Sequence, residues 1–73
     1  MDTDEKLIYM ANQIASFFAA QGETKAVAAI ADHIRKFWDP EMRHKFLILA
    51  DKPQTTLHPL TRKAVDLLRV KAG

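Results

Sequence analysis

The sequence predicts an all-α protein, a small bundle of four helices in a single domain over residues 1–73. Two observations lead to this prediction. Apolar residues recur at spacings of three and four through most of the chain, which is the period of an amphipathic helix. Helix-breaking residues interrupt this pattern at three places, around Gly22, at Asp39–Pro40 and across residues 51–59. No stretch alternates apolar and polar residues as a half-buried strand would.

The first helix is expected from about Thr3 to Gln21. Asp2 and Glu5 have the spacing of a capping box, and their charges suit the positive end of a helix. Gly22 suits the left-handed position that often ends a helix. The apolar face of this helix is predicted to consist of Leu7, Met10, Ala11, Ile14, Phe17 and Phe18.

The second helix is expected from about Thr24 to Trp38. Four alanines allow a neighbouring helix to approach closely; they are Ala26, Ala28, Ala29 and Ala31. The turn that joins the first two helices is short, so we predict an N-terminal antiparallel helical hairpin. The apolar face is predicted to consist of Val27, Ile30, Ala31, Ile34, Phe37 and Trp38.

The third helix is expected from Pro40 to Asp51, with Asp39 as its N-cap and the proline in its first turn. Its segment 46–50 is apolar nearly all round. The fourth helix is expected from Pro59 to Lys71. Its apolar residues are Leu60, Ala64, Leu67 and Leu68, and its basic residues are Lys63, Arg69 and Lys71.

These helices carry more apolar surface than a bundle of four short helices can enclose. Ile8, Tyr9 and Phe17 lie beside the main apolar face of the first helix, and the third helix is apolar on several sides. Large exposed apolar patches are uncommon on soluble monomers and usually mark a partner. The pattern therefore predicts an interaction role.

Catalytic and cofactor-binding groups are not expected in this chain. It has no cysteine, which excludes disulfides, cysteine–zinc sites and thiolate chemistry. The three histidines, His33, His44 and His58, lack the spacing of a helical zinc motif, so we expect surface or capping histidines. Two glycines cannot form a phosphate-binding loop, and Ser16 lies inside a predicted helix. No metal or cofactor is expected to be bound by this chain.

The charge of the chain and the apolar third helix argue against a nucleic-acid partner. The net charge is only +2, and residues 39–73 hold most of the basic excess, which favours a mixed, solvated surface over a phosphate-binding one. A helix-turn-helix reading would place Arg43, His44 and Lys45 on a recognition helix, but segment 46–50 leaves that helix little polar face. Nucleic acid is therefore not the expected partner.

The acidic N-terminus and the short apolar runs predict a cytoplasmic protein without a membrane span.

Several residues are candidates for a protein interface. Tyr9, Asn12 and Gln13 form a polar and aromatic patch on the first helix, although the two amides also suit a solvent-facing position. Phe37 and Trp38 end the second helix, where either core packing or an interface anchor would explain them. Arg43 suits a carboxylate, either Asp32 or Asp39 in this chain or one in a partner.

Two blocks of the sequence resemble the delta subunit of soluble NAD-dependent formate dehydrogenases. The first block is residues 6–18, KLIYMANQIASFF, and the second is residues 31–43, ADHIRKFWDPEMR, which contains the run His-Ile-x-x-Phe-Trp-x-Pro-x-Met-Arg typical of that family. A weaker likeness covers residues 57–68. The chain departs from the family at residues 52–56, where relatives are richer in glycine and alanine.

The resemblance implies a place in a cytoplasmic complex that oxidises formate to carbon dioxide and reduces NAD. The alpha subunit of that complex would carry the molybdenum–pterin centre and iron–sulfur clusters, and other subunits would carry FMN and the NAD site. The delta chain would be a non-catalytic component that supports assembly or stability. The resemblance suggests seven positions for docking on the alpha subunit, namely Tyr9, Asn12, Gln13, His33, Phe37, Trp38 and Arg43.

Two other interpretations stay open at this point. In the first, the chain acts transiently, as a maturation factor for the molybdenum-cofactor subunit. It would otherwise be an unrelated small helical protein that associates with itself or binds DNA, since self-association would also cover its excess apolar surface.

Overall fold

The computed structural model describes residues 2–72, with side chains up to Val70, so the predicted basic side chain of Lys71 lies outside the described residues. Four helices follow one another, α1 (Thr3–Phe18), α2 (Glu23–Phe37), α3 (Pro40–Ala50) and α4 (Pro59–Ala72), and the 3₁₀ turn η1 (Ala19–Gln21) extends α1. No strand occurs in this part of the chain, which confirms the all-α prediction. None of the described helices is long and apolar enough to cross a membrane.

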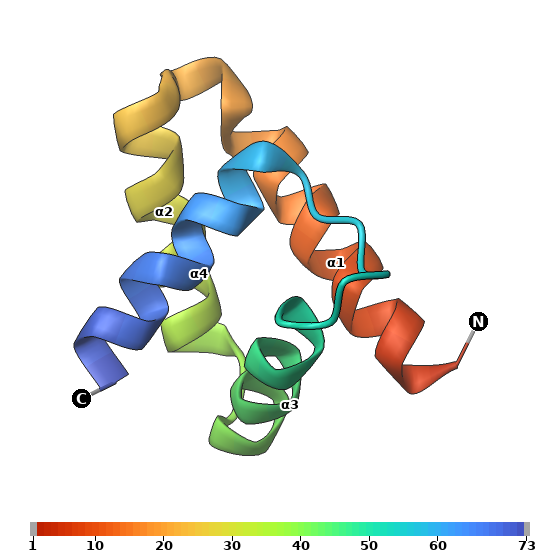
Figure 1. The fold of residues 1–73 in the computed structure, drawn as a ribbon. Coiled ribbons are helices and arrows are strands. Elements are labelled where there is room, and N and C mark those ends of the chain that lie inside the picture. The colour runs from red at the N-terminus through yellow and green to blue at the C-terminus, as the bar shows by residue number, and fades with distance from the viewer. Residues whose placement is uncertain (1, 73) are drawn as a thin grey trace.

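The helices pack around one another with α2 at the centre of the contacts. In Figure 1, α4 lies across α2, α1 flanks both, and α3 lies near the C-terminal end of α2. The contact of α2 with α4 is more extensive than its contact with α1. The predicted hairpin partners α1 and α2 therefore share a smaller contact than α2 and α4 do. That α1 and α2 run antiparallel stays a prediction. The accessible surface of 4802 Å² agrees with the roughly 4,600 Å² expected for a folded chain of this mass.

Local signals begin α1 and α3 where the sequence predicts. The carboxylate of Asp2 accepts a hydrogen bond from the backbone N–H of Glu5 at 2.8 Å, and Asp39 accepts one from Met42 at 2.8 Å. Each bond satisfies one of the N–H groups that a helix leaves free at its first turn. Pro40 occupies the first turn of α3, where no N–H is needed. Both predicted N-caps are confirmed.

Gly22 has a different role from the predicted left-handed cap. Its φ of 92° is positive, but its ψ of 153° is extended, so it reverses the chain without a left-handed turn. Its N–H closes the 3₁₀ turn on the carbonyl of Ala19, and Gly22 is also the N-cap of α2. For this reason α2 begins at Glu23, one residue before the predicted start.

The core is built from a few large side chains surrounded by small ones. Ile30, Ile34 and Phe46 are fully buried, and Trp38 packs edge-to-face on Phe46 with ring centroids 5.5 Å apart. On α1 most of the buried residues are alanines, which lets the other helices approach closely. The buried side chains of α1 are Leu7, Ala11 and Ala15, and those of α2 include the predicted Ala26 and Ala31.

Three residues assigned to apolar faces lie on the surface. Met10 is 39% exposed, Phe17 78% and Phe37 72%. Each has a neighbour in sequence that is buried or half-buried instead, respectively Ala11, Phe18 and Trp38. The periodicity was satisfied by either member of each pair, so it did not distinguish them.

The C-terminal end of α3 is closed by groups from α4 and from the preceding loop. Arg62 donates to the carbonyl of Ala50 at 2.7 Å, and Arg69 donates to the carbonyl of Leu47 at 3.1 Å. The hydroxyl of Thr55 donates to the carbonyl of Leu49 at 2.8 Å. Cations at this end also favour the negative pole of the helix.

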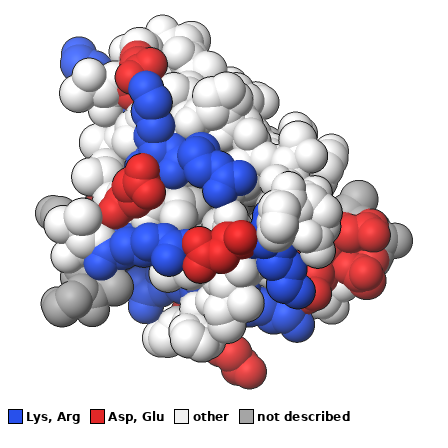
Figure 2. Space-filling view, viewed as in Figure 1, with Lys and Arg blue, Asp and Glu red and all other residues white. Residues whose placement is uncertain are grey.

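Most basic side chains of the second half of the chain take part in such internal contacts. The ion pairs among the described residues are Lys36–Asp32 at 3.0 Å, Lys45–Asp4 at 2.9 Å, Arg69–Asp51 at 2.7 Å and Lys63–Glu23. The hydrogen bond and charge of Asp4 raise the pKa of Lys45 above its ordinary value. On the face shown in Figure 2, basic and acidic groups alternate. This arrangement is the mixed surface that the sequence favoured, not a basic stripe.

Candidate functional site

The ends of α1 and α2 form a surface of aromatic rings. We call it the aromatic surface and define it by Gln13, Ile14, Phe17, Phe18, His33 and Phe37. Five of these residues, all but Phe37, line a shallow groove of about 330 Å³. The residues come from two helices because η1 and Gly22 turn the chain sharply enough to bring the end of α1 beside the middle of α2.

The rings of this surface stack in a continuous row. Phe17 packs edge-to-face on Phe18 at 5.2 Å between centroids, and Phe18 packs on His33 at 6.3 Å. His33 lies 4.7 Å from Phe37, its i+4 neighbour on α2. Phe18 and His33 are the two middle rings of the row and are half-buried. Phe17 and Phe37 are its end rings and project into solvent. His33 therefore contributes packing from a half-buried position rather than a fully exposed one.

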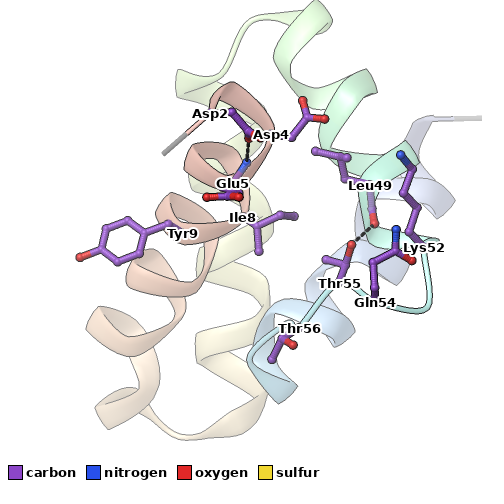
Figure 3. A pocket seen from close by; sticks show the side chains of 10 residues that line it. All are labelled: Asp2, Asp4, Glu5, Ile8, Tyr9, Leu49, Lys52, Gln54, Thr55 and Thr56. Carbon is purple, nitrogen blue, oxygen red and sulfur yellow. Dashed lines mark hydrogen bonds between the residues drawn. The ribbon is translucent and has the colours of Figure 1, made fainter.

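Tyr9 and Gln13 extend this surface along α1. Residues 9, 13 and 17 follow each other at intervals of four, so they share one face of the helix. The ring of Tyr9 is 53% exposed, and it points away from the 51–58 loop (Figure 3). Gln13 is also exposed. Four of the seven positions suggested for docking, Tyr9, Gln13, His33 and Phe37, thus lie on one connected face.

Asn12 lies about 100° around α1 from Gln13 and has a structural role. Its Nδ2 donates to the carbonyl of Thr56 at 3.1 Å, and its Oδ1 accepts from the backbone N–H of His58 at 2.9 Å. The amide thereby holds the extended end of the 51–58 loop against α1. His58 in turn caps α4, because its Nδ1 accepts from the N–H of Leu60 at 3.1 Å.

Trp38 and Arg43 also have contacts inside the fold. Trp38 is 5% exposed and belongs to the core. Arg43 donates through Nη1 to the backbone carbonyl of Arg35 at 3.1 Å, near the end of α2. The carboxylates considered for Arg43 have other partners, since Asp32 pairs with Lys36 and Asp39 caps α3. Of the two alternatives for Arg43, a carboxylate of this chain is replaced by the helix-end carbonyl of Arg35, and a carboxylate of a partner stays a prediction.

A second, larger hollow of about 550 Å³ lies between the start of α1 and the 51–58 loop (Figure 3). Ile8 and Leu49 project toward each other in it, and Asp2, Asp4 and Glu5 stand at one rim. Two of these carboxylates already have intramolecular partners, at the α1 cap and at Lys45. No group of three or more metal-ligating side chains gathers among residues 2–70. The hollow is thus a surface depression with apolar side chains inside and carboxylates at its rim.

Sequence reasoning included Phe37 but omitted Phe17 and Phe18 from the candidate docking positions. Phe17 was recognised as excess apolar surface, and this signal could have placed it beside Phe37. Phe18 was assigned to the core and is half-buried, so its ring serves both the core and the surface.

Comparison with known proteins identifies the family of this chain. A family model described as the NADH-dependent formate dehydrogenase delta subunit FdsD matches residues 6–65, which is well over half of the 73-residue chain. The matched segment includes the whole of the aromatic surface. Searches of the curated proteins and of the solved structures found no match.

Proposed function

Since this chain belongs to the NADH-dependent formate dehydrogenase delta subunit family, we propose that it is a non-catalytic accessory subunit of a cytoplasmic formate dehydrogenase complex. Its role would be to bind the catalytic alpha subunit and to support assembly or stability of the complex. The molybdenum–pterin centre, iron–sulfur clusters, FMN and NAD would be held by the other subunits. Without a cysteine, this chain lacks the usual ligand for an iron–sulfur cluster.

The exposed phenylalanines carry this proposal. Phe17 and Phe37 are more than 70% exposed, although burial of a phenylalanine side chain is worth about 1.5–3 kcal/mol. An accessory subunit that docks through such side chains explains why they remain at the surface. By contrast, several charged side chains that a small charged ligand could use, Asp2, Asp4 and Asp39 among them, are engaged in helix caps and an ion pair.

The physical mechanism of support follows from binding linkage. A subunit that binds the folded alpha chain and not its unfolded form stabilises the fold by RT ln(1 + [L]/Kd), which is about 2.7 kcal/mol at a hundredfold excess over Kd. The same linkage would favour a folded assembly intermediate while cofactors are inserted. No catalytic group of this chain is required for either effect.

Co-expression tests the proposal directly. The complex is produced with and without this chain, and the tag is placed on the chain. We expect the alpha subunit to co-purify in a fixed ratio, and the complex that lacks the chain to lose activity faster on heating. The proposal would be refuted if the alpha subunit failed to co-purify and both preparations had the same activity and the same inactivation rate.

The same preparations distinguish the maturation-factor interpretation. A maturation factor would be absent from the purified active enzyme, and its deletion would lower the molybdenum content of the alpha subunit without changing the thermal inactivation of loaded enzyme. A permanent subunit would be present in stoichiometric amount.

A further inference from the structure

The third helix, α3, has the smallest contact with the rest of the fold. Its main contact is with α1, its contact with α4 is small, and its contact with α2 is smaller still among the described residues. The other three helices are joined more closely to one another, above all α2 and α4. In Figure 1, α3 lies at the lower edge of the molecule. The helices α1, α2 and α4 thus share contacts that do not involve α3.

Non-helical backbone flanks α3 on both sides. Trp38 and Asp39 precede it in extended conformations, with ψ values of 136° and 163°. Residues 51–58 follow it as turns and extended chain. The far end of this loop is fixed to α1, because the Asn12 amide bonds to its backbone. A few residues at each end of α3 can therefore absorb a change of backbone dihedral angles while α1 and α4 stay in place.

Two arginines of α4 hold the C-terminal end of α3. A helix leaves its last four carbonyls without a partner inside the helix. Arg62 donates to the carbonyl of Ala50 at 2.7 Å. Arg69, two turns further along α4, donates to the carbonyl of Leu47 at 3.1 Å. Both arginines are exposed residues, so the end of α3 is fastened to α4 by polar bonds at the surface.

Buried side chains also attach α3, so its release has a cost. Phe46 is fully buried, and Leu49 and Ala50 are buried beside it. A helix of 11 residues is marginal on its own, so α3 would lose its internal hydrogen bonds once it left the fold. The contact of α2 with α4 would be kept, which makes this partly opened state more populated than the fully unfolded chain.

We propose that α3 opens as a flap while α1, α2 and α4 stay folded, and that Arg62 and Arg69 are its latch. Opening uncovers the ring of Phe46 and that of Trp38, whose centroids lie 5.5 Å apart in the closed fold. The flap thus controls whether two large rings of the core reach the surface. All of these contacts lie within one chain, so the flap does not depend on the proposed function.

Amide hydrogen exchange of the full chain tests the flap. Amides of residues 46–50 need only the local opening, whereas amides of residues 28–34, in the middle of α2, need the whole chain to unfold. We expect the α3 amides to exchange faster than the α2 amides by about tenfold or more, after correction for intrinsic rates. Equal protection of the two segments would overturn the proposal, because α3 would then be released only by global unfolding.

Removal of one arginine tests the latch. Arg62→Met keeps a long, helix-forming side chain and removes the hydrogen-bond donors. We expect exchange of residues 46–50 to accelerate about tenfold, as for the loss of a hydrogen bond from a charged group, and exchange of residues 28–34 to change less than about twofold. Lys63→Met is the matched control, because Lys63 is the next residue on α4 and pairs with Glu23 of α2. It should change α3 exchange by less than about twofold, since an exposed ion pair contributes little.

The same measurements can contradict the latch. Equal acceleration of both segments by Arg62→Met would show that this arginine stabilises the whole fold and not α3 in particular. If Arg62→Met does not fold, Arg69→Met takes its place, because it removes the bond to Leu47 at the same helix end. Unchanged α3 exchange in the folded variant would likewise overturn the assignment of the arginines.

Discussion

Replacing Asn12 by alanine should destabilise the isolated chain strongly, although Asn12 is a half-buried polar residue on a helix surface. The substitution removes two hydrogen bonds, to the carbonyl of Thr56 and from the N–H of His58. Both bonds join α1 to a loop more than forty residues away, so they close the loop that connects α3 to α4. The loss is therefore tertiary rather than local.

The magnitude follows from these contacts. Each hydrogen bond contributes about 1 kcal/mol, and a half-buried N–H left without an acceptor costs about 1–3 kcal/mol. Alanine recovers about 0.5 kcal/mol of helix propensity relative to asparagine. The expected net loss is about 2 kcal/mol. For a domain of this size that corresponds to a fall in Tm of about 8–16 °C.

Thermal and urea unfolding followed by circular dichroism measures this loss. Gln13→Ala is the matched control, since Gln13 is the adjacent amide on the same helix and is exposed. It should change stability by less than about 0.5 kcal/mol. If Asn12→Ala and Gln13→Ala unfold at the same temperature, the loop is not held by the Asn12 amide and the reasoning is refuted.

Three further predictions concern the core, the turn and pH. Trp38→Ala should lower the free energy of unfolding by about 3–5 kcal/mol, because it leaves a cavity beside Phe46. Loss of helicity in the isolated variant would show this effect. A stable variant with selectively weakened partner binding would contradict it. Gly22→Ala should cost about 1 kcal/mol or more in urea unfolding, because an L-residue is strained at a φ of 92° even though the space for a methyl group is open. Asp4 raises the pKa of Lys45, so their pair stabilises the fold below the ordinary pKa of 10.5 and this contribution disappears as the pH rises through the higher folded value. Urea midpoints of wild type and Asp4→Asn should therefore converge above that pH, and parallel profiles up to the alkaline limit would argue against the pair.

The predicted docking positions show that helical periodicity alone does not tell surface residues from residues engaged inside the fold. The apolar spacing and the aromatic residues near helix ends indicated a surface that needs a partner, and Phe37 and Tyr9 do lie exposed. Trp38 and Asn12, chosen by the same signals, instead serve the core and the loop. No local sequence signal distinguishes these two outcomes, because both residue types are compatible with either environment.

By itself, the sequence determined the four helices and the beginnings of α1, α3 and α4. A cap such as Asp2 or Asp39 acts on a backbone N–H three residues away, and the apolar period needs only the helix itself. These interactions are local, so they can be read along the chain without knowing where the helices pack.

The tertiary structure alone decided between adjacent residues of similar chemistry. It buried Trp38 and exposed Phe37, it half-buried Phe18 and exposed Phe17, and it engaged Asn12 while leaving Gln13 in solvent. Successive residues on a helix lie about 100° apart, so a rotation of the helix by less than a third of a turn exchanges their environments. That rotation is set by contacts with helices and loops distant in sequence, and the pattern within one helix does not contain it.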